Sequence, residues 1–245
     1  MVLPKIEVPE YECVLPSNQK TVRFRPFLVK EQKLLLMASE SSEAKDVIDS
    51  MKKVIKNCVI GELDVDALPV FDLEFLFLNL RARSVGEVVK INYKCNNLIS
   101  KNDDGIENRC ENVVPIEVNV LEINPTFGEG HSNKIELTDK LGIVFKYPTF
   151  EVMENIVDKT ENDIIFTLII KCIDFIYDDE SIYYAKDATQ EELIEFIDGL
   201  QQEHLEKIKQ FFDTMPKVKK DVEFKCNKCG HHETIEIEGM QNFFV

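Results

Sequence analysis

Alternating apolar and polar positions open the chain and predict a β-hairpin. The segments EYECVLP and KTVRFRPF alternate in this way, and the stretch between them has the composition of a turn. Apolar residues then recur at helical spacing across residues 29–61, where SESSEA interrupts them with serines that suit a helix start. We therefore expect two helices after the hairpin, the second ending at Gly61.

The next part of the chain predicts a buried helix followed by strands. The segment ALPVFDLEFLFLNLRARS is apolar and begins with a proline that suits a first helical turn. GEVVKINYKC and ENVVPIEVNVLEI alternate cleanly as strands, and the polar stretch between them predicts a loop. A further short hairpin is expected in NKIELTDKLGIVFKYP.

From Pro148 to Pro216 the pattern predicts helices almost throughout. Thr189, followed three residues later by Glu192, marks one helix start as a capping box. Another helix is expected to form core through a broad apolar face. That face consists of Ile164, Ile165, Leu168, Ile169, Cys172, Ile173 and Ile176.

Four of the seven cysteines lie in two segments that share one plan. VVKINYKC leads to CENVVPIEVNVLEI, and KDVEFKC leads to CGHHETIEIEG, so each segment reads strand, cysteine, loop, cysteine, strand. Both upstream strands end in aromatic–Lys–Cys. Two such knuckles facing each other would supply the four thiolates of a structural zinc site. The predicted ligands are Cys95, Cys110, Cys226 and Cys229.

The two cysteine pairs differ in how closely they match the spacing of a metal-binding knuckle. The second pair is a C-x2-C turn followed by Gly230, whereas 14 residues separate the first two cysteines. Alternatively, Cys226 and Cys229 could recruit His231 or His232, or the thiols could be ordinary. A four-cysteine site has no open position and would be structural rather than catalytic. The cations that could offset its charge are Lys94, Arg109, Lys225 and Lys228.

These patterns predict an α+β fold. We expect β-hairpins and a zinc-ribbon-like pair of strand–knuckle–strand units, packed with a mainly helical middle segment. Residues 1–148 would form a β-rich α+β region with the first knuckle, and residues 149–216 a helical region. Residues 217–245 would form a C-terminal hairpin that packs back on residues 85–123.

Composition and charge narrow the function classes. The chain has 245 residues, of which 44% are hydrophobic and 30% charged, as in an ordered globular protein. Its formal net charge of −16 opposes binding to nucleic-acid phosphates. No apolar run approaches the ~20 residues of a membrane span, and we expect no secretory signal. The thiols expected in the core are Cys13, Cys58 and Cys172.

No catalytic constellation is visible in the sequence. It contains no G-x-S-x-G, no H-E-x-x-H and no Walker-type loop. We therefore expect neither enzymatic activity nor a small-molecule substrate.

Three segments carry a family resemblance: FRPFLVKEQK, FFDTMPK and the closing C-x-x-C–Gly hairpin. They are similar to the baseplate hub and hub-assembly proteins of T-even-type contractile-tailed bacteriophages, and the similarity covers nearly the whole chain. It implies a non-catalytic role in building the central hub, as a subunit or as an assembly chaperone, with other hub proteins as partners. It also implies a location in the host cytoplasm during assembly or in the tail baseplate of the virion.

Two segments are candidates for partner contact. RFRPF combines Arg23, Arg25 and Phe27, and the C-terminus carries Phe243 and Phe244. Exposed phenylalanines at a chain end would form an apolar patch of the kind that marks a partner site. Alternatively, the arginines could pair with local acids and the phenylalanines could pack in the core.

A competing function is a zinc-ribbon nucleic-acid-binding or late-transcription regulatory protein. Such a protein needs a basic face. Apart from the lysines of the knuckles, cations cluster only at Lys217, Lys219 and Lys220. Charge therefore favours the baseplate interpretation.

Overall fold

The computed structural model describes residues 6–41, 44–101, 107–154 and 161–238. Helices and small antiparallel sheets alternate along it, which confirms the predicted mixture of α and β structure. The chain forms two compact units. The first comprises Met1–Leu63, Glu74–Pro125 and Lys217–Val245, and the second comprises Asp64–Leu73 and Thr126–Pro216.

The predicted N-terminal hairpin is present in the first unit. β1 (Tyr11–Val14) pairs antiparallel with β2 (Thr21–Phe24). The second helix was expected to continue to Gly61, but it ends at Cys58, and β3 (Val59–Ile60) adds to β2 as a third strand. The two β-branched residues favour an extended backbone once β2 offers a partner.

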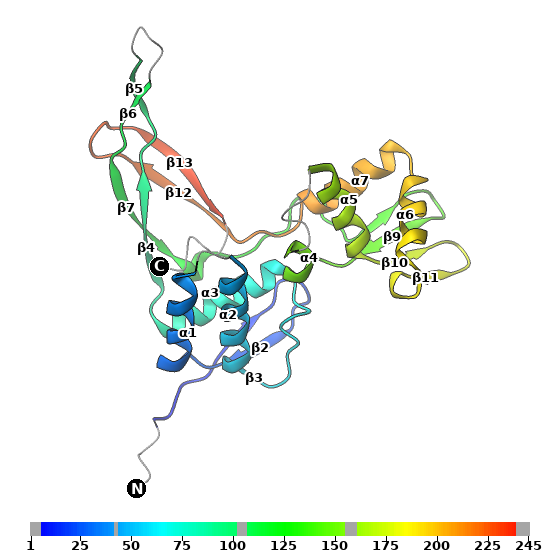
Figure 1. Cartoon of the computed structure of the whole chain (residues 1–245), viewed down its shortest axis with the longest axis horizontal. Coiled ribbons are helices and arrows are strands. Elements are labelled where there is room, and N and C mark those ends of the chain that lie inside the picture. Colours follow the sequence, from blue (N-terminus) through cyan, green and yellow to red (C-terminus); the bar gives the residue numbers. More distant parts are fainter. Residues whose placement is uncertain (1–5, 42–43, 102–106, 155–160, 239–245) are drawn as a thin grey trace. The chain divides into compact units, whose positions relative to one another are not determined.

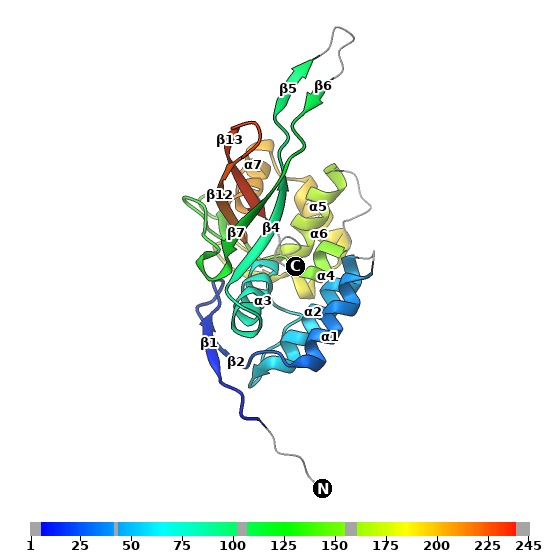
Figure 2. The same cartoon turned by 90° about the vertical axis from the view of Figure 1, so that its left-hand side faces the viewer.

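Two helices and most of a third, whose residues 70–73 belong to the second unit, complete this part of the first unit, as the apolar spacing predicted. They are α1 (Val29–Ser39), α2 (Ala44–Cys58) and α3 (Val70–Ser84), and Figures 1 and 2 show α1 and α2 side by side. Their fully buried side chains form a core together with Phe24 of β2. The core residues include Met51, Val54, Ile55, Leu76, Phe77 and Leu80.

Two long antiparallel ribbons also belong to the first unit, as predicted. β4 (Val88–Lys94) pairs with β7 (Val113–Asn119), and β12 (Lys219–Lys225) pairs with β13 (His232–Glu238). A short 3-10 helix, η1 (Val120–Glu122), follows β7.

The segment between β4 and β7 was predicted as a loop, and this prediction was wrong for part of it. β5 (Leu98–Lys101) and β6 (Glu107–Arg109) pair there as a second hairpin, which Figure 2 shows beyond the end of the β4–β7 ribbon. All side chains of both strands are exposed. Without a buried face the sequence has no apolar alternation that could reveal them.

The second unit contains a four-stranded antiparallel sheet with the order β11-β10-β9-β8. The hairpin formed by β8 and β9 was predicted. The strands are β8 (Lys134–Glu136), β9 (Gly142–Phe145), β10 (Ile173–Tyr177) and β11 (Ile182–Tyr184).

Strand β10 corrects the prediction of a continuous helix through Ile173 and Ile176. The helix ends at Cys172, and β10 then pairs with β9 and β11. The register shifts between Ile173 and Phe175, so a bulge leaves Ile173 and Ile176 both buried although they are three residues apart. The bulge thus imitated the spacing of a helix in the sequence.

Helices cover one face of this sheet. They are α4 (Phe150–Glu154), α5 (Glu161–Cys172), α6 (Gln190–Asp198) and α7 (Gln202–Asp213), with a 3-10 helix η2 (Ala185–Asp187) before α6. The predicted capping box is confirmed, because Thr189 Oγ1 accepts from the Glu192 amide at 3.2 Å and Glu192 Oε2 accepts from the Thr189 amide at 2.7 Å. Among the described residues, no helix has the length and apolarity of a membrane span.

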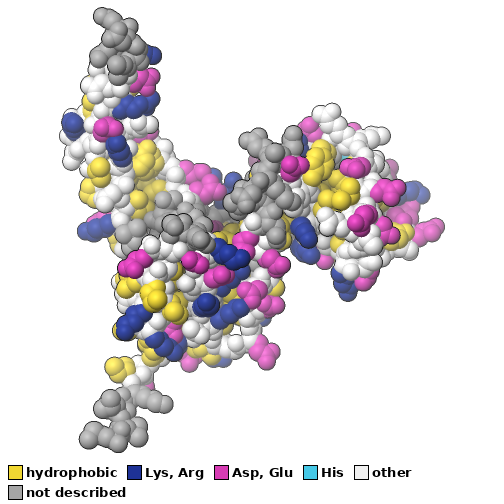
Figure 3. Space-filling model, viewed as in Figure 1, with side chains coloured by type: hydrophobic (Ala, Val, Ile, Leu, Met, Phe, Trp, Pro, Cys, Tyr) yellow, Lys and Arg dark blue, Asp and Glu magenta, His cyan; other side chains and the backbone are white. Residues whose placement is uncertain are grey.

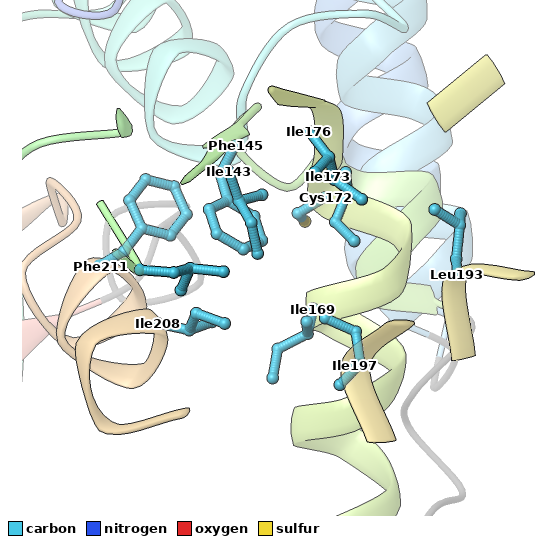
Figure 4. Close-up of a cluster of buried hydrophobic side chains, with 11 residues drawn as sticks. Ile143, Phe145, Ile169, Cys172, Ile173, Ile176, Leu193, Ile197, Ile208 and Phe211 are labelled. Atoms are coloured by element: carbon cyan, nitrogen blue, oxygen red, sulfur yellow. The ribbon is translucent and has the colours of Figure 1, made fainter. Parts of the chain in front are cut away.

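A cluster of buried side chains joins these helices to the sheet. In Figure 4, Ile208 and Phe211 of α7 point toward Phe145 and Ile169, and Ile197 lies on the far side of the same cluster. Phe145 and Phe211 stack with ring centroids 5.2 Å apart. The second unit therefore has a hydrophobic core of its own.

Candidate metal centre

The ends of the two long ribbons position the four predicted ligands. Cys95 directly follows β4 and Cys226 directly follows β12. The Cys95 amide donates to the Asn112 carbonyl at 2.8 Å, and the Cys110 amide donates to the Asn97 carbonyl at 2.9 Å. These bonds close the base of the β5–β6 hairpin, so its length does not separate Cys95 from Cys110.

The second knuckle is a tight turn between β12 and β13. The Gly230 amide donates to the Cys226 carbonyl at 3.0 Å, and the Cys226 amide donates to the His231 carbonyl at 2.8 Å. Gly230 has a φ of 74°, in the left-handed region that glycine tolerates best. The turn leaves Cys226 and Cys229 on the same side.

The four sulfur atoms converge from these two knuckles. They all lie within 4.8 Å of one another, and the Cys95–Cys229 and Cys110–Cys226 Sγ pairs are each 3.7 Å apart. A tetrahedron of Zn–S bonds of ~2.3 Å has edges of about 3.8 Å. The spacing therefore suits four thiolates on one metal ion and is far too long for a disulfide, whose S–S bond is about 2.05 Å.

Amide side chains support the sulfurs in a way that the sequence analysis missed. Asn112 Nδ2 lies 3.5 Å from Cys226 Sγ, and Asn97 Nδ2 lies 3.7 Å from Cys229 Sγ. Donors of this kind stabilise coordinating thiolates and fix their direction. Each asparagine lies two residues from a cysteine of the first knuckle, and this position is the only sequence signal that could have identified it.

The thiols have unequal affinities for protons. Hydrogen bonds from the Cys229 and Lys228 amides, together with the Asn112 side chain, lower the pKa of Cys226 to about 6 despite its burial. Burial raises the pKa of Cys95 to about 12. The knuckle amides thus favour a thiolate at Cys226, and a metal ion bound by all four sulfurs would displace protons from the others.

The cations predicted to offset the charge of the sulfurs differ in their bonding partners. Lys94 pairs with Glu111 at 2.7 Å, and Arg109 pairs with Glu107 at 2.7 Å. Lys228 donates to the Cys110 carbonyl at 3.4 Å. Of these three cations, Lys228 is the one that hydrogen-bonds the backbone of a cysteine.

The histidines of the second knuckle lie beside acidic residues. His231 Nε2 is 3.5 Å from Glu233, and His232 Nε2 is 3.9 Å from Glu223. Within the described ranges, the cluster of candidate metal ligands consists of the four cysteines without either histidine.

The repeated aromatic–Lys–Cys sequence has a structural counterpart. Tyr93 and Phe224, the two aromatic residues of the repeat, pack edge to face with ring centroids 4.7 Å apart. Phe224 is buried, and the Tyr93 hydroxyl reaches Glu233 at 3.4 Å. The pair joins the β4–β7 ribbon to the β12–β13 ribbon, and each of its residues lies two positions before a cysteine of the cluster.

The residues predicted to contact partners differ in their surroundings. Arg25 pairs with the buried Glu31 at 3.0 Å, and Phe27 is buried. Arg23 is exposed and lies 3.7 Å from Glu10. Phe243 and Phe244 lie outside the described residues. The other three thiols are buried as expected; they are Cys13, Cys58 and Cys172.

Fold and site together define a mixed α/β protein whose two long ribbons meet at a cluster of four cysteines. The family model described as T4 bacteriophage base plate protein matches residues 8–245, so the chain belongs to that family. It is therefore a phage tail baseplate protein. No curated protein and no solved structure matches the chain.

Proposed function

We propose that the protein acts in the central hub of the tail baseplate, as a hub subunit or as a chaperone of hub assembly. The match to the baseplate family over residues 8–245 carries the proposal. The hub assignment rests in addition on FRPFLVKEQK and FFDTMPK, which resemble hub and hub-assembly proteins. The role is non-catalytic and depends on contacts with other baseplate proteins, in the host cytoplasm during assembly or in the virion.

Surface charge supports a protein partner over a nucleic acid. On the face shown in Figure 3, Lys and Arg side chains are interspersed with Asp and Glu. Lys217 pairs with Glu238, Lys219 with Glu236 and Lys220 with Glu122, so the lysine cluster is neutralised locally. A nucleic-acid interface needs a field of uncompensated positive charge.

The C-terminal phenylalanines are the strongest candidates among the predicted contact residues. Arg25 and Phe27 make contacts within the chain, which occupy their side chains. Arg23 is exposed, and Phe243 and Phe244 would supply the apolar anchors that interfaces favour.

Quantitative mass spectrometry of purified particles and of trapped hub intermediates tests this function. Stoichiometric presence in both identifies a hub subunit, and presence only in the intermediates identifies an assembly chaperone. Absence from both contradicts the hub role. Binding of this chain to DNA at low salt would instead favour the nucleic-acid function.

We further propose that Cys95, Cys110, Cys226 and Cys229 bind one structural zinc ion. The Sγ separations of 3.7 Å, the amide donors and the closed four-sulfur arrangement support this assignment. The zinc would join two ribbons that are each only two strands wide, and isolated two-stranded ribbons are marginally stable in water.

Replacement of Cys226 and Cys229 by serine should abolish zinc binding and expose the amides of both ribbons to hydrogen exchange. Zinc content is measured by elemental mass spectrometry, and exchange is followed peptide by peptide. The control is Cys172→Ser, which removes a buried thiol of the second unit and should leave the zinc content unchanged. A double variant that keeps one zinc per chain would contradict the site.

A further inference from the structure

A groove lies between α1 and the end of α3, within the first unit. The Phe27 amide donates to Ser84 Oγ at 2.9 Å and so fixes the segment before α1 against the last residue of α3. Each wall of the groove is a helix face on which residues recur three or four positions apart. The residues of these faces are Leu35, Leu36 and Ser39 on one side and Phe77, Arg81 and Val85 on the other.

The lining of the groove is apolar both at its base and where it meets solvent. Phe77 and Leu35 are buried, whereas Leu36 and Val85 are 58% and 59% exposed. Exposed aliphatic side chains around a hollow that already has an apolar base form the kind of surface that another apolar group covers.

The size and charge of the groove indicate what it can hold. Its volume is about 160 Å³, and an apolar cavity of ~150 Å³ holds one benzene molecule. Among the described residues that line it, Arg81 is the only charged one, and Arg81 Nη1 donates to the Gly86 carbonyl at 3.1 Å. The groove therefore suits a single aromatic ring from an uncharged segment.

The open end of the β12–β13 ribbon lies near this groove. Lys220, the second residue of β12, pairs with Glu122 of η1 at 3.2 Å. In the same 3-10 helix, the Val120 amide donates to the Glu87 carbonyl at 2.8 Å. Glu87 follows Val85 of the groove by two residues. A short series of contacts thus connects the start of β12, and with it the end of β13, to the groove.

The segment that follows β13 has the composition that the groove requires. β13 ends at Glu238, and residues 239–245, which lie outside the described ranges, come next. These seven residues carry no charged side chain, although 30% of the chain is charged. An extended segment of this length spans up to ~23–25 Å, more than the ~17 Å length of α1. Its apolar residues are Met240, Phe243, Phe244 and Val245.

We propose that a phenyl ring from Phe243 or Phe244 occupies the groove of the same chain. The ring would cover Leu36 and Val85 and extend the apolar base of the groove. A segment held this close by a short connection has an effective concentration in the millimolar range, which favours its own groove over that of a second copy. The two phenylalanines would then reach a baseplate partner only after they leave the groove.

Amide hydrogen exchange of the full chain, followed peptide by peptide over α1 and α3, tests this contact. Phe243→Ser with Phe244→Ser removes both rings, and Val85→Asp places a charge at the groove. Each change should accelerate exchange in these helices about tenfold, because burial of one phenylalanine side chain stabilises the closed state by at least that factor. A chain with all three substitutions should exchange no faster than either variant, since both remove the same contact.

Val113→Asp is the matched control, because it makes the same change at a 54% exposed valine of β7 in the first unit. It should leave exchange in α1 and α3 unchanged. Additive effects of the phenylalanine and groove substitutions overturn the proposal, and so does an unaltered chain whose two helices already exchange as fast as those of the phenylalanine variant.

Sedimentation equilibrium distinguishes the groove of the same chain from that of a second copy. The unaltered chain should show no self-association that Val85→Asp abolishes. A dimer that dissociates on Val85→Asp would place the segment in the groove of another copy and would also overturn the proposal. Neither measurement concerns the presence of the protein in particles or its zinc content, so the hub role and the zinc assignment can stand or fail separately.

Discussion

Glu31 is a buried carboxylate that joins three segments of the first unit. Its side chain is fully buried and accepts hydrogen bonds from Arg25 Nη2 at 3.0 Å and from the Leu28 amide at 2.8 Å. Arg25 also donates to the carbonyls of Pro26 and Asn57, each at 2.9 Å. The pair therefore connects the end of β2 with the start of α1 and the end of α2. Glu31→Gln keeps the shape of the side chain and removes its charge.

The contacts set the size of the expected effect. Removal of one partner from a buried ion pair costs ~3–5 kcal/mol when the other charge is left alone. Here Arg25 keeps two carbonyl acceptors and is 20% exposed, and glutamine keeps an oxygen for the Leu28 amide. The loss is then close to that of one charge-assisted hydrogen bond, ~1.5–3 kcal/mol. We expect Glu31→Gln to lower the free energy of unfolding by about 2 kcal/mol at pH 7.

The same contacts predict how this loss depends on pH. Burial alone would raise the pKa of Glu31, but the hydrogen bonds from Arg25 and the Leu28 amide outweigh burial and hold the pKa below its ordinary value. A lowered pKa in the folded state stabilises the protein above the unfolded pKa, and this stabilisation disappears as the pH falls through the folded pKa. The difference between the unaltered chain and Glu31→Gln should therefore be full at pH 7 and shrink below about pH 4.

Urea unfolding followed by far-ultraviolet circular dichroism measures both effects. Arg23→Gln is the matched control, because Arg23 lies in β2 two residues before Arg25, and its pair with Glu10 is 3.7 Å long and exposed. Such a pair contributes ~0–1 kcal/mol, so the control should stay close to the unaltered chain. The reasoning is refuted if Glu31→Gln is as stable as Arg23→Gln at pH 7, or if its deficit persists undiminished at pH 3.

Two further predictions concern the second unit. The ring of Tyr177 lies over Gly142 on the neighbouring strand, so the methyl group of Gly142→Ala would displace that ring. We expect Gly142→Ala to lower the free energy of unfolding in urea by ~1–3 kcal/mol. In a chain that also carries Tyr177→Ala, Gly142→Ala should cause no further loss. His131 bonds Thr214 Oγ1 at 2.8 Å and the Tyr147 hydroxyl at 2.9 Å, and burial lowers its pKa. As the pH falls below about 6.5, His131 is protonated in the unfolded chain before it is protonated in the folded chain. The free energy of unfolding should therefore decrease between pH 7 and 5, and His131→Gln should remove the part of this decrease that His131 causes.

The cluster of four cysteines was predictable because its signal is local and repeated. Each aromatic–Lys–Cys ends a strand with clear alternation, so the ribbons and the positions of the cysteines follow from adjacent residues. The contact between Tyr93 and Phe224 is known only from the structure. The supporting amides of Asn97 and Asn112 have no comparable signal, because asparagine is common in loops and its role depends on the direction of one side chain.

The sequence did not reveal β10 or the β5–β6 hairpin, and the physical reason differs between the two cases. β10 is a core strand whose bulge puts Ile173 and Ile176 on the buried face at a spacing that also fits a helix. Pairing with β9 decides whether this segment is a strand or a helix. Even the nearest paired residues in the sequence, Phe145 and Ile173, are 28 positions apart, so a local pattern cannot reveal the pairing. β5 and β6 bury no side chain, so no pattern of burial could mark them.

The order in which the four cysteines of the cluster are synthesised has a consequence for folding. Cys110 and Cys226 are 116 residues apart, and Cys95 and Cys229 are 134 residues apart, with most of the second unit between them. The second unit has its own core and can fold before the C-terminal ribbon exists. Closure of a shorter effective loop costs less entropy, so a folded second unit favours the meeting of the two knuckles. Binding of the proposed zinc ion would then be a late step, which requires the C-terminal knuckle with Cys226 and Cys229.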